Sequence, residues 1–250
     1  MTAVQAMAEM SFLNRIHEAL GGACFGIVLV VIVLLTMRSE LAKIQLAKRH
    51  RRELASWVQS RGLRFHYNYD DRLAECFEGF LCLQGEENPL ARNIYKGSCN
   101  GRYVIAFDYS GGVFRPEEKQ NARGDFSAVI VTTNLQMKPL VIQPRDLRAG
   151  LTEFIGYGDI DFESAEFSRE FYVKSPDKRW AYDVLNQAAM ELLLASPRFT
   201  LQFAETSVIA YNGYRFEASE FEAALTLIEG ILQRLPPSLV HELQAGGQNA

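Results

Sequence analysis

The longest hydrophobic run in the chain lies near its start. Residues 19–37 carry no charge, and the stretch from Ile27 to Leu35 contains only Ile, Val and Leu. A helix of this length spans about 28 Å, which is close to the thickness of the hydrocarbon core of a bilayer. The pattern predicts a single transmembrane helix over residues 19–37, preceded by a short extracytoplasmic N-terminus over residues 1–18.

A cleaved signal peptide and a buried core helix are the alternatives for such a run, although a core helix rarely carries so unbroken an apolar stretch. Signal peptides begin with a basic region, whereas here Arg15 is offset by Glu9 and Glu18, and the run is followed by Met37-Arg38 instead of a small-residue cleavage site. Lys and Arg next to a span are retained on the cytoplasmic side. A C-terminal domain in the cytoplasm, at the inner membrane, is therefore expected from the basic residues after the span, which are Arg38, Lys43, Lys48, Arg49, Arg51 and Arg52.

Two further features concern the membrane-proximal region. Gly22 and Gly26 form a GxxxG, a spacing that lets two membrane helices approach closely. A homodimer through this face is one interpretation, beside contact with the lipid bilayer; the alternative is that Gly is simply common in membrane helices. Residues 38–61 lack Pro and Gly and favour a basic juxtamembrane helix, which Gly62 is expected to end. We interpret the basic residues of this helix as a solvated face that sets the membrane topology; specific recognition of a lipid is the alternative.

The pattern changes after Gly62. Residues 62–240 mix period-two and helical spacings, which predicts a cytoplasmic α+β domain with an antiparallel sheet, and residues 241–250 are expected to be a flexible tail. Asn100-Gly101 and Asn212-Gly213 are typical of type I′ hairpin turns. Strands are expected over 63–67, 93–97, 102–109, 126–133, 139–143, 208–211 and 214–216, and Phe199, Leu201 and Phe203 also alternate. In the strand over 102–109, the alternation from Tyr103 through Ile105 and Phe107 to Tyr109 predicts that these four side chains share one face. Helices are expected from a cap at Asp70 to Phe80, over 179–195, and from a Ser219-Glu220-Phe221-Glu222 capping box to Pro236.

A polar stretch of 16 residues, 110–125, separates two of these strands. Structureless loops of that length in a compact domain are either functional or disordered. A mobile hairpin tip is the favoured interpretation, and a functional loop remains the alternative.

Charge is distributed unevenly along the chain. Residues 1–52 hold seven Lys/Arg and three Asp/Glu, against 19 and 27 in residues 53–250. An acidic domain repels polyphosphate, so we expect no nucleic-acid partner. The four cysteines, Cys24, Cys76, Cys82 and Cys99, show no CxxC spacing, which suits a reducing compartment better than a disulfide framework.

Candidate chemistry is sparse. The sequence contains no GxGxxG, GxxxxGK[ST], HExxH or GxSxG motif, so no cofactor and no catalytic residue are assigned. A structural role is favoured for His66, and Cys76, Cys82 and Cys99 lack a base nearby in sequence. Asp159, Asp161 and Glu163 alternate, and their oxygens suit Mg²⁺ or Ca²⁺. Without the glycine turn of an EF-hand, capping or pairing with Arg169 or Arg179 is favoured over a metal site.

Several blocks of the sequence carry a resemblance to a protein family. They are Arg51–Leu54, Arg61–Phe65, Ala106–Tyr109, Asp159–Val173 and Asp177–Leu185. Together they resemble a group of uncharacterised bacterial membrane-anchored proteins. The resemblance implies a membrane helix followed by a cytoplasmic α+β domain, and it implies no activity. The loop after Tyr109 is shorter here than in that group.

Three functional hypotheses follow. The first is a membrane-tethered interaction or scaffolding domain with a protein partner, because no catalytic constellation stands out. The alternative is a ligand- or metal-binding sensor, or an enzyme, with an acidic site around Asp159, Asp161 and Asp183. A lipid-handling role is a third hypothesis that rests on proximity to the bilayer. The sequence leaves enzymatic activity open and favours a binding role.

Overall fold

The computed structural model describes residues 34, 37–38, 40–41, 45, 48–66, 70, 72–84, 90–111, 125–146 and 158–246. The predicted membrane segment lies outside these residues except for Leu34 and Met37, and so do Gly22, Gly26 and Lys43. Within the described part, no helix is both long enough and apolar enough to cross a membrane. The chain divides between Arg52 and Glu53 into two units, of which the second, residues 53–250, is the α+β domain.

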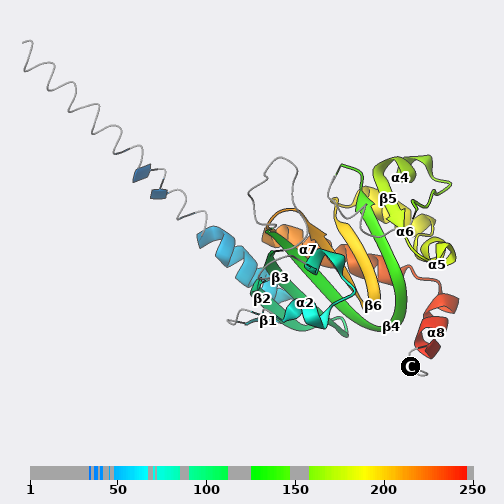
Figure 1. Cartoon of the computed structure of the whole chain (residues 1–250). Coiled ribbons are helices and arrows are strands. Elements are labelled where there is room, and N and C mark those ends of the chain that lie inside the picture. Colours follow the sequence, from blue (N-terminus) through cyan, green and yellow to red (C-terminus); the bar gives the residue numbers. More distant parts are fainter. Residues whose placement is uncertain are drawn as a thin grey trace, which may run out of the picture. The chain divides into compact units, whose positions relative to one another are not determined.

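The domain begins within a helix that covers residues 48–60 (Figure 1). Gly62, with φ of +68°, ends it as predicted, because glycine adopts this left-handed conformation without steric cost. In chain order the elements that follow are β1 (Leu63–His66), α2 (Leu73–Cys76), the 3-10 turn η1 (Leu81–Leu83), β2 (Leu90–Cys99), β3 (Arg102–Ser110), β4 (Phe126–Pro144), α4 (Ala165–Glu170), β5 (Phe171–Lys174), α5 (Lys178–Val184), α6 (Gln187–Ala195), β6 (Thr200–Asn212), α7 (Ala218–Gln233) and α8 (Pro237–Gly246). The predicted α+β class is confirmed.

The sheet has six strands, and all its pairings are antiparallel. Strands β1, β2 and β3 are paired in order, and β3 pairs with the first half of β4. Strand β5 pairs with the end of β4, while β6 pairs with β4 along both halves. Since each strand has two edges, β3 and β5 share one edge of β4 and β6 lies on the other. The Asn100-Gly101 hairpin turn is confirmed, with φ of 50° and 75° at its two residues.

Strand β4 differs from the prediction of two strands over 126–133 and 139–143. It is one strand of 19 residues, and its register with β6 shifts on both sides of Met137. The polar residues between the two predicted strands lie at this irregularity, where Asn134, Gln136 and Lys138 are exposed. A bulge tolerates such a sequence without ending the strand.

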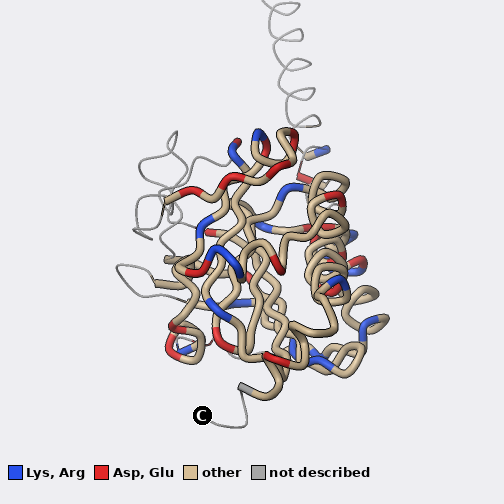
Figure 2. The backbone as a smooth tube through the Cα atoms, turned by 90° about the vertical axis from the view of Figure 1, so that its right-hand side faces the viewer, with Lys and Arg blue, Asp and Glu red and all other residues tan. Residues whose placement is uncertain are grey.

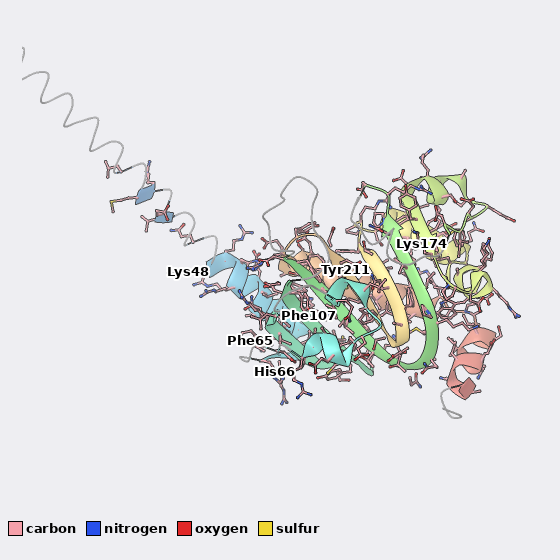
Figure 3. The ribbon with its side chains drawn as sticks, in the orientation of Figure 1. Lys48, Phe65, His66, Phe107, Lys174 and Tyr211 are labelled. Carbon is pink, nitrogen blue, oxygen red and sulfur yellow. The ribbon has the colours of Figure 1, made fainter. Side chains whose placement is uncertain are left out.

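Each face of the sheet packs into its own hydrophobic core, because side chains alternate between faces along a strand. One face, here called the helix-covered face, packs against residues 54–58, α7 and α8. The opposite face, here called the α2 face, packs against α2 and η1. Figure 1 shows α2 in front of the sheet and α7 behind it. Two large side chains of the α2 face, Phe107 and Tyr211, are labelled in Figure 3.

Two helix predictions were wrong in their details. The predicted helix over 179–195 is split into α5 and α6, because the Asn186 side chain accepts a hydrogen bond from Ala189 N and starts a new helix. Helix α7 is capped by a box between Glu217 and Glu220, not by one starting at Ser219. Its predicted apolar stripe is buried, with Phe221, Leu225, Ile228 and Leu232 all facing the core.

Three loop predictions also need correction. Asp70 does not cap α2; it forms a β-bridge with Ala91, and its carboxylate accepts a hydrogen bond from Arg72 N. Asn212-Gly213 does not form a hairpin turn, because the Asn212 side chain accepts a hydrogen bond from Gly213 N and donates one to Arg198 O. Residues 214–216 run beside Ser127 instead. Helix α8 continues to Gly246 with Leu243 buried, through residues expected to start the tail.

Candidate functional site

The acidic residues singled out in the sequence have structural partners. Asp159 accepts hydrogen bonds from Val173 N at 2.9 Å and from Arg145 at 3.0 Å, which fixes the approach to α4 against β5. Asp183 lies 3.8 Å from Arg179 one turn earlier on α5. Asp161 contributes its backbone carbonyl, which accepts a hydrogen bond from the Tyr182 hydroxyl.

Glu163 is exposed beside Ser164, the residue that caps α4. Within the residues that the structure describes, no group of three or more His, Cys, Asp or Glu side chains is placed to hold a metal ion. Asp159 and Asp183 belong to ion pairs on separate elements, so the structure does not join them into one acidic site.

The other residues singled out lie apart from one another. Arg38, Lys48, Arg49, Arg51 and Arg52 are exposed, and Lys48 is labelled in Figure 3. His66, the last residue of β1, is exposed and is labelled in Figure 3. Cys82 is fully buried under the α2 face, and this burial raises the pKa of its thiol. Cys99 is also buried, whereas Cys76 is exposed.

Cys76 borders a pocket at one end of the α2 face. The pocket has a volume of about 160 Å³. One wall comes from α2 and the turn after it, and the opposite side comes from β4 and β6. The lining residues are Cys76, Phe77, Gly79, Phe80, Thr132, Ala204, Glu205, Thr206 and Ser207. The Phe77 and Phe80 rings stack with their centroids 5.9 Å apart, which makes the α2 wall apolar.

The floor of the pocket continues into a line of hydroxyl groups across the sheet. Ser98 is paired with Tyr103, Tyr103 with Thr132, and Thr132 with Ser207. Directly paired residues project from the same face, and Tyr103 alternates with Ile105, so these four side chains lie on the α2 face. We call them the hydroxyl row. The Thr132 and Ser207 hydroxyls are 3.2 Å apart, and the Tyr103 side chain is 47% exposed.

Glu205 stands at the pocket in an unusual backbone conformation. Its φ is +50°, in the left-handed region that residues other than Gly, Asn and Asp seldom adopt. It lies opposite Met137, where the register between β4 and β6 shifts. A bulge of this kind re-aims the side chains beside it. The Glu205 side chain is exposed, and among the described residues it takes part in no ion pair.

The α2 wall is fixed to the sheet by hydrogen bonds from buried side chains. Gln202 accepts a hydrogen bond from Leu81 N at 3.0 Å, and the Tyr109 hydroxyl donates one to Leu83 O at 2.8 Å. Gly79 approaches β6 so closely that a Cβ on it would lie 2.6 Å from the Cβ of Ala204. One side of the pocket is therefore the α2 wall, which is anchored to the sheet, and the other side carries the polar groups of β4 and β6.

The volume limits what the pocket can bind. Pockets that enclose a small-molecule ligand measure about 300–1,000 Å³, whereas a cavity of about 150 Å³ holds one benzene-sized group. At about 160 Å³ this pocket fits one aromatic or branched aliphatic side chain. Its hydroxyls and carboxylate can bind polar groups at the rim.

Sequence reasoning did not find this pocket. Its two sides are about 55 to 130 residues apart in the chain, and no motif joins them. The alternation of Tyr103 with Ile105, Phe107 and Tyr109 gave the face of Tyr103 correctly. The positions of Thr132 and Ser207 opposite it depend on the strand register, which the sequence left open.

Comparison with known proteins gives a fold likeness. No family model matches the chain, and no curated protein matches it. The structure is similar to the crystal structure of the mycobacterial trehalose monomycolate transport factor A, TtfA, with a TM-score of 0.52 and 13% sequence identity over 74% of this chain and 96% of that chain. At this identity the likeness concerns the fold alone. The resemblance to membrane-anchored bacterial proteins stays a prediction.

Proposed function

We propose that this chain is a membrane-tethered accessory protein whose cytoplasmic α+β domain binds a protein partner. The observation that carries the proposal is the pocket on the α2 face. A volume of about 160 Å³ suits the anchor side chain of a partner better than a whole small molecule. Exposed Tyr103 next to it provides an aromatic contact of the kind enriched at protein interfaces.

The tether is the apolar segment 19–37, with the basic residues after it placing the domain in the cytoplasm. The way the chain enters the domain supports this arrangement. We call the helix over residues 48–60 the entering helix; its Leu54, Trp57 and Val58 are buried in the core of the helix-covered face. The second unit therefore includes the end of the helix by which the chain reaches it, and Gly22 with Gly26 would allow two copies to pair in the membrane.

The fold likeness suggests the class of process. The similar structure is that of a transport factor, so an accessory role in transport is the process that we propose. Charge supports a protein partner over nucleic acid. Figure 2 shows Lys/Arg and Asp/Glu positions intermixed along the described elements, and a nucleic-acid site would require a basic stripe.

Cell fractionation and site-specific photo-crosslinking test the proposal. The full chain, expressed in its native host, should stay in the membrane fraction after an alkaline carbonate wash, and a reporter on its C-terminus should be active only in the cytoplasm. A photo-crosslinking residue placed in turn at Tyr103, Tyr182 and Tyr214, which are 46–49% exposed, should give a reproducible protein adduct from at least one position. A soluble chain, a periplasmic reporter or the absence of adducts at all three positions would contradict the proposal.

A further inference from the structure

We infer that the pocket receives one branched aliphatic or aromatic side chain from a partner segment that carries Lys or Arg next to it. The inference rests on the proposed function and specifies the chemistry of the partner. Three properties of the site define the segment: the apolar wall, the hydroxyl row and the carboxylate of Glu205.

The apolar wall selects the anchor side chain. Phe77 and Phe80 stack against each other, and Phe80 is 1% exposed, so the wall is anchored in the core and cannot be displaced cheaply. Burial of apolar surface gives about 25 cal/mol per Å², so contact with the partly exposed Phe77 favours a Leu, Ile or Phe side chain at this wall. A polar side chain in the same place would lose water without recovering this gain.

The hydroxyl row gives the segment its direction. It crosses four strands that lie about 4.8 Å apart, so it covers roughly 14 Å, the length of four extended residues. Burial increases along it, from exposed Ser98 and Tyr103 to Ser207, which is 5% exposed. Hydroxyls both donate and accept, so they can satisfy the backbone N–H and C=O groups of a segment that lies across them.

Charge selects the residue beside the anchor. Glu205 lines the pocket, is exposed, and has no ion-pair partner among the described residues. The domain is acidic as a whole, with 19 Lys/Arg and 27 Asp/Glu in residues 53–250. A basic residue next to the anchor would pair with Glu205 and would be drawn to the domain, while an acidic one would be repelled.

Peptide protection of Cys76 tests the inference on the full chain in detergent micelles. The probes are capped hexapeptides with the sequence Ser-Ser-Leu-Lys-Ser-Ser and two relatives in which Leu is replaced by Ser or Lys by Glu. Because Cys76 is exposed and lines the pocket, a bound peptide should slow its alkylation, which mass spectrometry of the Cys76 peptide measures. At millimolar concentration we expect at least threefold slowing by the Leu-Lys peptide, and less than 1.5-fold slowing by either relative.

A charge reversal gives the matched control. In Glu205→Lys the preference should invert, so that the Leu-Glu peptide protects and the Leu-Lys peptide does not. Glu166→Lys, a reversal at an exposed residue on α4, should keep the original preference. Equal protection by all peptides, no protection, or an unchanged preference in Glu205→Lys would overturn the inference. So would protection by a disaccharide such as trehalose, which would indicate a sugar as the occupant.

The crosslinking positions separate this inference from the proposed function. Adducts from Tyr182 or Tyr214 without adducts from Tyr103 would keep the proposed function and reject the pocket as its site. Adducts from Tyr103 that disappear in Glu205→Lys, with the chain still in the membrane fraction, would support both. No adduct from any position would reject both.

Discussion

Arg61 holds the carboxylate of Glu222 at two points, across 161 positions of sequence. Its Nε donates to Oε2 at 2.8 Å and its terminal nitrogen donates to Oε1, while Trp57 Nε1 donates to Oε2 at 2.8 Å. Trp57 also stacks on Phe221, the neighbour of Glu222 on α7. The end of the entering helix is therefore fixed to α7 by an aromatic contact and by a carboxylate that accepts hydrogen bonds from both Trp57 and Arg61.

The first prediction concerns acid stability. The hydrogen bonds from Arg61 hold the pKa of Glu222 below its usual 4.5. As the pH falls, the Glu222 carboxylate is therefore protonated in the unfolded chain before it is protonated in the folded chain. The stabilisation is present at neutral pH and is lost below about pH 4.5 as the pH passes through the folded pKa. Glu222→Gln should lose about 1 kcal/mol of unfolding free energy at pH 7, because the side chain is 37% exposed, and should show a flatter acid limb.

Urea titrations of the full chain at pH 7 and pH 4, followed by circular dichroism, measure this effect. Glu166→Gln, which removes an exposed carboxylate on α4, is the control and should follow the unmodified chain at both values. An acid limb of unchanged slope in Glu222→Gln would show that the pair does not stabilise the fold.

The second prediction concerns Trp57, which is 7% exposed. Trp57→Ala removes a large core side chain and should cost about 3–4 kcal/mol of unfolding free energy. Trp57→Phe keeps a ring against Phe221 but removes one donor to Glu222. The variant should therefore lose about 1 kcal/mol of unfolding free energy beyond what the smaller ring loses in packing. Trp180→Phe is the matched comparison, because Trp180 Nε1 is buried with no hydrogen-bond acceptor among the described residues.

Urea denaturation gives all three values. We expect Trp57→Phe to be more destabilising than Trp180→Phe, since the second variant loses packing alone. The opposite order would mean that the Glu222 contact adds nothing to the packing of Trp57.

The sequence predicted those parts of the fold that depend on local signals. Asn100-Gly101 specified a hairpin turn, and the alternation from Tyr103 to Tyr109 specified two faces. It failed where a side chain replaced a backbone turn. Asn212 uses its own amide to close the end of β6, so the same Asn-Gly dipeptide gave a false hairpin. Asn186 likewise starts a helix inside an unbroken helical pattern.

The pocket could not have been predicted, for a different reason. It depends on Glu205 having a positive φ in the middle of an extended strand, for which the sequence carries no glycine or asparagine signal. It also depends on Gly79 meeting Ala204 across the domain. Both are consequences of long-range packing. Asp159 forms an ion pair, as the favoured interpretation of the acidic residues expected, but its partner is Arg145 and not Arg169 or Arg179; Asp183 pairs with Arg179.

The third prediction follows from the conformation of Glu205. Glycine adopts a φ of +50° without the steric cost that Glu bears, and this gain is partly offset by the greater entropy of glycine in the unfolded chain. Glu205→Gly should therefore raise the free energy of unfolding by about 0.5 kcal/mol. For a domain of this size, that raises the melting temperature by about 1–2 °C. The same variant should lose the preference for the Leu-Lys peptide over the Leu-Glu peptide, because the carboxylate is gone.

Gln136→Gly provides the control for this gain. Gln136 is exposed on the same irregular part of β4 and does not have a positive φ, so glycine there should lower the melting temperature by about 2–4 °C. Differential scanning calorimetry of both variants measures the two shifts. A loss of stability in Glu205→Gly equal to that in Gln136→Gly would show that the backbone at Glu205 carries no strain.

The fourth prediction concerns the hydrogen bonds that fix the pocket wall. Gln202 is 2% exposed, accepts from Leu81 N and donates to the Tyr211 hydroxyl at 2.9 Å. Gln202→Leu removes both contacts and leaves the partly buried Leu81 N without this acceptor, which should cost about 2–3 kcal/mol, mostly through local loosening of residues 80–84. Cys82 lies within them, and its burial raises the pKa of its thiol, so its alkylation reports each local opening.

Alkylation rates of Cys82 and Cys99, mapped by mass spectrometry, separate local from global opening. Every 1.4 kcal/mol of lost local stability multiplies the open population by ten, so Cys82 should react at least tenfold faster in Gln202→Leu. Cys99 is buried on the helix-covered face, away from Gln202, and its rate should change much less. If the alkylation rates of both thiols rose equally, the variant would be unfolding globally. Gln202 would then stabilise the whole domain and not specifically the pocket wall. If neither rate changed, the bond to Leu81 N would not be what holds η1 on the sheet.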